Sequence, residues 1–98
     1  MPIPDYQSVM LPLLQFAEDR LEHSLRETID ALADVFALTP VERKQLLPSG
    51  QQEVFDNRVG WARTYLTKAG LLKKTRRGHY EISRAGLDAL AAKPSRVD

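Results

Sequence analysis

The sequence predicts a mainly α (α+β) domain, a winged helix-turn-helix with a two-stranded β wing, from three observations. Apolar residues between Glu53 and Ala69 recur at the spacing of one helix face, so this stretch forms the longest helix. Two short segments follow it, joined by a basic turn, as the strands of a wing are. Residues 57–84 carry eight basic side chains and one acid, whereas residues 1–56 carry four basic side chains and ten acids. Such a concentrated basic patch is typical of nucleic-acid binding.

The chain of 98 residues has the length of one small domain. We assign residues 1–92 to this domain and residues 93–98 to a tail or the start of a linker, because this end is polar, contains a proline and has no periodic pattern. The absence of cysteine excludes disulfides and thiolate metal sites, and we expect a cytoplasmic protein. No apolar run approaches the roughly 18 residues of a membrane span, and no signal peptide is evident, so we expect no membrane partner.

The first helix is expected to begin at Pro4-Asp5, with an acid at its positive end. Pro12 interrupts its apolar pattern, so the helix either kinks there or begins later. The segment Leu21–Ser24 is a short connection or a minor strand. Within it, we expect His23 to be a turn residue that bonds to the backbone.

Two capping boxes mark the next helices. Ser24-Leu25-Arg26-Glu27 begins the second helix, because the serine oxygen can accept from the Glu27 amide while the Glu27 side chain reaches back. Thr39-Pro40-Val41-Glu42 begins a third helix, which we expect to extend to about Leu47. Ser49 or a near neighbour is expected to cap the long helix.

The long helix has a core face and an outward face. Its apolar stripe is spaced by alternate steps of four and three residues and comprises Phe55, Val59, Ala62, Leu66 and Ala69. The opposite face presents polar and cationic side chains, and Gly70 is expected to end the helix.

The wing follows directly. Leu71–Lys74 and His79–Ile82 are the expected strands, and Thr75–Gly78 is the turn, in which Gly78 is free to take positive φ. We expect Tyr80 to face the core. Ser83 is expected to cap a final helix.

Several stretches together resemble the N-terminal domain of Mrr-type restriction endonucleases. The most distinctive is DNRVGWARTYLTKAGLL at Asp56–Leu72; others are IPDYQ at Ile3–Gln7, EHSLRE at Glu22–Glu27 and LLPSGQ at Leu46–Gln51. The resemblance covers nearly the whole chain and implies a winged helix that binds DNA. It also implies a parent chain with a separate, C-terminal, Mg²⁺-dependent nuclease domain acting on modified, chiefly methylated, foreign DNA. We therefore expect this chain to bind rather than cut, with no catalytic residue, metal or cofactor of its own.

Ten side chains of the long helix and the wing are the predicted contacts to double-stranded DNA. Asn, Thr, Arg and Lys can hydrogen-bond base edges or phosphates, and wing cations can neutralise phosphates. The predicted set is Asn57, Arg58, Trp61, Arg63, Thr64, Lys68, Lys73, Lys74, Arg76 and Arg77.

Each part of this set has a structural alternative. Arg58 can instead pair with an acid on the second helix. The wing cations can simply protect a strand edge from aggregation. Trp61 either stacks on DNA or packs against the neighbouring helix or wing with a partly exposed edge. For the domain as a whole, the alternative function is a protein-interaction or dimerisation module without direct DNA readout, which would include assembly into a homodimer.

Overall fold

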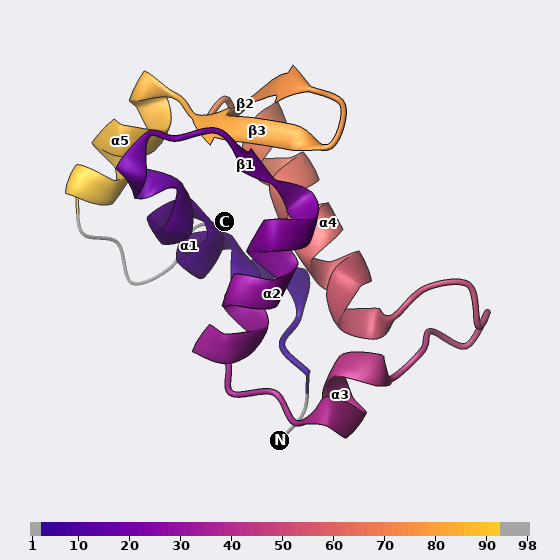
Figure 1. The fold of residues 1–98 in the computed structure, drawn as a ribbon. Helices are drawn as coiled ribbons and strands as arrows, with labels where there is room; N and C mark the ends of the chain where they lie inside the picture. Colours follow the sequence, from indigo (N-terminus) through magenta and orange to yellow (C-terminus); the bar gives the residue numbers. More distant parts are fainter. Residues whose placement is uncertain (1–2, 93–98) are drawn as a thin grey trace.

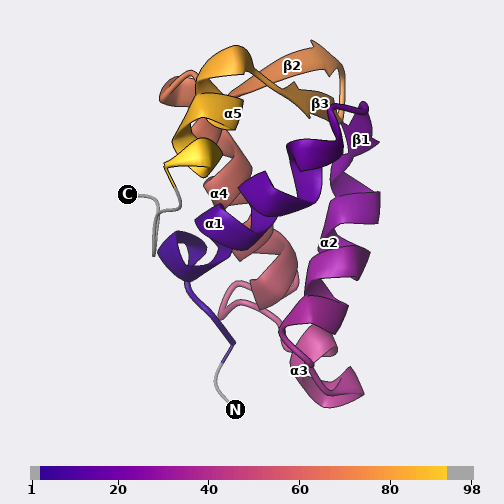
Figure 2. The ribbon, with the colours of Figure 1, turned by 90° about the vertical axis from the view of Figure 1, so that its left-hand side faces the viewer.

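The computed structural model describes residues 3–92, so the segment 93–98, predicted as a tail, lies outside the described residues. Helices α1, α2 and α4 lie beneath a small sheet, and α3 lies at the end of the molecule away from that sheet (Figures 1 and 2). The elements in chain order are α1 (Tyr6–Phe16), the 3₁₀ turn η1 (Ala17–Asp19), β1 (His23–Ser24), α2 (Leu25–Val35), α3 (Pro40–Lys44), α4 (Val54–Lys68), β2 (Leu72–Arg76), β3 (His79–Ile82) and α5 (Arg84–Ala91).

The starts of α1, α2, α3 and α5 follow the sequence signals. Asp5 caps α1 by accepting from the amide of Ser8, and α1 runs through Pro12, which excludes a start beyond that residue. Both capping boxes form, and Ser83 accepts from the amide of Gly86 at the start of α5. No helix among residues 3–92 is long and apolar enough to cross a membrane.

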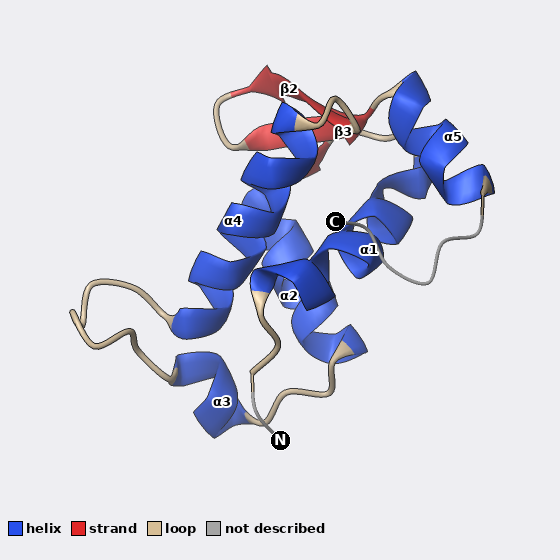
Figure 3. Cartoon of the chain, turned by 180° about the vertical axis from the view of Figure 1, so that it is seen from behind, coloured by secondary structure: helices blue, strands red, loops and turns tan. Residues whose placement is uncertain are grey.

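The segment between α3 and α4 differs from the prediction. Helix α3 ends at Lys44 rather than near Leu47, because Gln45 takes an extended conformation and Leu46 pairs with Glu53 in an isolated β-bridge. Glu53, not Ser49, is the N-cap residue of α4, and it makes no side-chain capping bond. The segment instead forms an extended loop before α4, visible in Figure 3.

The sheet has three antiparallel strands in the order β1-β3-β2, so the minor strand predicted near His23 joins the two strands of the wing. Strand β2 ends at Arg76, two residues later than expected, and a bulge lies between Lys74 and Arg76. Gly78 takes φ 75° in the turn, as predicted.

The core lies between α4, the other helices and the inner face of the sheet. Phe55, Val59, Ala62 and Leu66 are buried as predicted, and Tyr80 is buried beneath β3. Ala69 is exposed, contrary to the prediction, because α4 ends at Lys68 and Ala69 is already its C-cap residue.

His23 is not a turn residue bonding to the backbone, as was expected. It lies in β1 with only 6% of its surface exposed, opposite Tyr80 of β3. Its Nε2 lies 2.9 Å from Asp19 and its Nδ1 lies 3.0 Å from Glu27. We call this arrangement of Asp19, His23 and Glu27 the histidine clamp.

Candidate nucleic-acid interface

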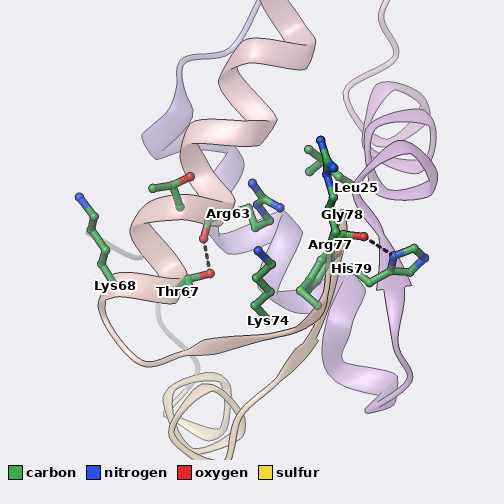
Figure 4. A pocket seen from close by; sticks show the side chains of 10 residues that line it. Leu25, Arg63, Thr67, Lys68, Lys74, Arg77, Gly78 and His79 are labelled. Carbon is green, nitrogen blue, oxygen red and sulfur yellow. Dashed lines mark hydrogen bonds between the residues drawn. The ribbon is translucent and has the colours of Figure 1, made fainter.

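A cleft opens between α4 and the wing (Figure 4). Its volume is about 460 Å³, and Leu25 and the buried Tyr80 are among its apolar lining residues. Four cationic side chains line it as well: Arg63 and Lys68 from α4, and Lys74 and Arg77 from the wing. Within the part of the chain that the structure describes, none of these four has a carboxylate within ion-pair distance. The cleft therefore presents positive charge from both walls to a ligand.

The α4 wall also contributes two threonines. The hydroxyl of Thr64 donates to the carbonyl of Gly60 at 3.0 Å, and that of Thr67 donates to the carbonyl of Arg63 at 2.7 Å. Each hydroxyl proton is thus used within the helix, whereas each oxygen keeps acceptor capacity. Gly60 adds no side chain to this face, and a Cβ there would meet open space.

The strand register of the wing separates its four predicted cations into two that line the cleft and two that form ion pairs with carboxylates of the domain. Lys74 lies opposite Tyr80, so both side chains are on the inner face, where Lys74 reaches the cleft. Lys73 lies opposite Glu81, and the two form an ion pair at 3.1 Å.

On the far side of the bulge, Arg76 and Arg77 differ in the same way as Lys73 and Lys74. Arg76 reaches Glu22, in the segment before β1, with an N–O distance of 3.2 Å. Arg77, at the turn, lines the cleft. Two wing cations thus face the cleft and two are paired inside the domain. Sequence alternation alone did not separate them, because the bulge changes the register after Lys74.

Asn57 and Arg58 lie near the start of α4, outside the cleft. The amide of Asn57 donates to Gln52 at 3.2 Å. Arg58 forms no ion pair with an acid of α2 within residues 3–92; instead Arg26 of α2 pairs with Asp56 of α4 at 3.2 Å. Hydrogen bonds from Ser8 lower the pKa of Asp5, the N-cap residue of α1, and the charge of Arg58 adds to this effect.

Trp61 is 48% exposed, and its ring lies 5.9 Å from that of Tyr65. Tyr65 in turn stacks on Tyr6 of α1, with ring centroids 4.9 Å apart. Trp61 therefore packs toward the neighbouring helix through Tyr65 and keeps an exposed edge. The sequence analysis did not single out Tyr6 and Tyr65 as partners of Trp61. Tyr65 follows Trp61 by four positions, which is the spacing of neighbours on one helix face, so this contact could have been predicted.

The sequence contains one Glu-x-Lys tripeptide, Glu42-Arg43-Lys44, which the sequence analysis did not consider as part of a metal site. It lies on α3, where the Glu42 carboxylate accepts from the amide of Thr39 at 2.8 Å. Arg43 pairs with Asp30 at 2.6 Å. No group of three His, Cys, Asp or Glu side chains within residues 3–92 could hold a metal ion.

A helix-loop-helix core, a small antiparallel sheet and a basic wing beside the exposed face of α4 define a winged helix-turn-helix domain. The chain belongs to the Mrr N-terminal domain family, whose model matches residues 6–92. It is 34% identical over 95 residues to the type IV methyl-directed restriction enzyme EcoKMrr of Escherichia coli (strain K12). That match covers 96% of this chain but only 31% of the enzyme, so the chain spans about a third of its relative's length. No solved structure matches the chain.

Proposed function

We propose that this domain is the double-stranded DNA-binding module of a restriction-system protein. In this proposal α4 enters the major groove, whose width admits a helix, and the cleft between α4 and the wing receives the phosphodiester backbone of one strand. The supporting observation is the set of four cations on the two walls of the cleft, none of which has a carboxylate partner among residues 3–92. Release of counterions from the neutralised phosphates drives binding.

The outward face of α4 provides the groups for base readout. Asn57 and Thr64 carry amide and hydroxyl groups that match base edges in the major groove. Asn57 and Arg58 lie at the start of the helix, whereas the cleft lies near its end, so the two sets of contacts would extend along α4. Lys73 and Arg76, which are paired internally, would add less to binding than Lys74 and Arg77.

The family membership supports the wider role. We propose that the domain directs a separate Mg²⁺-dependent nuclease domain to methylated foreign DNA in the cytoplasm. The relative is named a methyl-directed restriction enzyme, and the chain matches about a third of it. Cutting, and the magnesium it requires, would then be properties of that separate domain, while this domain supplies affinity and position.

The test is fluorescence anisotropy with a labelled duplex of about 20 base pairs, methylated and unmethylated, at several salt concentrations. Four phosphate contacts in the cleft should give a log–log salt slope near −3.6, at about 0.9 per contact. Asn57→Ala should change the preference among duplex sequences and leave this slope unchanged. No binding to any duplex at low salt would contradict the proposal.

A protein-interaction role is the second candidate, favoured by apolar side chains left exposed near α3. Val41 is 80% exposed, Leu46 54% and Val35, at the end of α2, 66%. Self-association measured by sedimentation that persists at high salt, together with the absence of DNA binding, would favour this role.

A further inference from the structure

A second hollow lies on the other side of α4, between this helix and α1. Its volume is about 330 Å³, and Met10, only 4% exposed, lies at its base. The stacked rings of Tyr6 and Tyr65 form part of its wall. Gln7 and Lys68 supply its long polar side chains. The hollow thus combines aromatic surface with an amide and a cation.

Lys68 connects this hollow to the cleft, because its side chain lines both. Its Nζ lies 6.0 Å from the centroid of the Tyr65 ring. None of the described residues that line the hollow is acidic. A ligand that is anionic, has a flat aromatic part and already contacts the cleft would match these features, and a nucleotide of bound DNA has all three.

We propose that the hollow receives a single unpaired base of the DNA strand held in the cleft, an inference that rests on the proposed DNA binding. Tyr6 already stacks on the Tyr65 ring, so the base would pack against the part of Tyr65 that remains exposed, 40% of the residue, beside Trp61. The Gln7 amide can both donate to and accept from the edge of the base. Lys68 would hold the adjoining phosphate. The volume lies at the lower end of the range of about 300–1,000 Å³ for ligand pockets, as suits one base.

The energetic consequence is a preference among DNA substrates. Displacing a paired base costs stacking and pairing energy, and stacking on an aromatic side chain returns part of that energy. DNA that already contains an unpaired base avoids the cost. The domain should therefore bind a duplex with a single-base bulge about tenfold more tightly than the matched duplex.

The experiment compares three duplexes of equal length: fully paired, with a central one-base bulge, and with an abasic bulge. The abasic bulge bends as easily but offers no base. Wild-type protein should prefer only the base-containing bulge, and the single tryptophan should lose fluorescence with that duplex alone. Tyr65→Ala and, as a second variant at an exposed position, Gln7→Ala should bring the bulged-to-paired affinity ratio close to one.

Arg77→Ala is the matched control, since it removes a cation that lines the cleft but not the hollow. It should weaken binding to all three duplexes alike and preserve their ratio. Equal affinity of the wild type for all three duplexes, or an equal preference for both bulges, would overturn the base site and leave the DNA-binding proposal standing. Binding to none of them would overturn both. Loss of self-association in Tyr65→Ala, with an unchanged bulge preference, would assign the hollow to a second copy of the chain.

Discussion

Charged side chains meet opposite surroundings at the two edges of β3. At the β1 edge, a titratable ring is buried between two acids: His23 lies between Asp19 and Glu27. At the β2 edge, Lys74 and Arg77 face an open cleft and have no carboxylate partner within residues 3–92. The comparison separates charges that hold the fold together from charges that are available to a ligand.

The β1 edge is closed by more than the clamp. The hydroxyls of Thr28 and Tyr80 share a hydrogen bond of 2.5 Å beneath the sheet, and the amide of Leu25 donates to the carbonyl of Gly78 at 2.9 Å. Burial raises the pKa of Tyr80 to about 12, so this phenol stays neutral at ordinary pH. The β1 edge thus fixes the position of β3, and with it the wing on which the cleft depends.

The largest expected effect comes from reversing the charge of the cleft. In the double variant Lys74→Glu, Arg77→Glu, duplex affinity should fall on the order of a hundredfold at low salt, since hydrogen bonds to charged groups contribute about 1.5–3 kcal/mol each. The salt slope should become shallower by about two. Anisotropy titrations measure both, and thermal unfolding serves as the control, because neither side chain has an ion-pair partner in the described structure to lose. Retained affinity would show that the cleft is not the DNA site.

The next largest effect is expected at the β1 edge of β3, and it should change the stability of the domain rather than its DNA binding. His23→Ala removes a buried ring and leaves two carboxylates facing each other, so the free energy of unfolding should fall by about 1–3 kcal/mol. We expect less than for a fully buried pair, because the side chains of Asp19 and Glu27 are 44% and 51% exposed. Urea denaturation measures the change. A variant as stable as the wild type would mean that the clamp does not hold the fold.

The clamp also predicts a pH dependence. Burial acts to lower the pKa of His23, but hydrogen bonds and charges from Asp19 and Glu27 outweigh it, so the pKa is raised above 6.5. The stabilisation is then fully present below pH 6.5 and is lost as pH rises through the raised value.

Unfolding free energy measured from about pH 6 to pH 9 should therefore decline in the wild type. His23→Ala should show a flatter profile over the same window. At the acid end the hydrogen bond from His23 lowers the pKa of Glu27, so acid should remove stability there as well. An unchanged alkaline decline in His23→Ala would assign it to another group.

Local signals predicted most of the fold. Both capping boxes, the positive φ of Gly78 and the inward position of Tyr80 are confirmed, because each depends on residues within a few positions in the chain. The wrong predictions concern places where segments that are distant in the sequence meet in the fold. Helix α3 is shorter because Leu46 bridges to Glu53, and His23 is buried because β1 pairs with β3 more than 50 residues later.

The grouping of the candidate site residues also depends on segments that are distant in the sequence. Charge and spacing predicted Arg63, Thr64 and Lys68 on the outward face of the long helix, and the structure joins them to Lys74 and Arg77 in one cleft. Composition could not show which wing cations have acidic partners, because Glu22 is 54 residues from Arg76. The hollow beside Tyr65 could likewise not be predicted from the sequence, because it requires Tyr6 of α1 to lie against α4.

The smallest expected effect tests whether paired and unpaired cations really differ. Lys73→Ala and Arg76→Ala remove the same charge as substitutions at Lys74 and Arg77, so a purely electrostatic patch would respond equally to all four. Lys73 and Arg76 already share their charge with Glu81 and Glu22, and a ligand would have to compete with those carboxylates.

We expect each variant to change duplex affinity by about twofold or less and stability by about 0–1 kcal/mol, the range of exposed ion pairs. Anisotropy and urea denaturation on the four single alanine variants make the comparison. Equal losses of duplex affinity at all four positions would mean that DNA responds to the total charge of the wing and not to particular cations. The distinction between the two edges of β3 would then apply to stability alone.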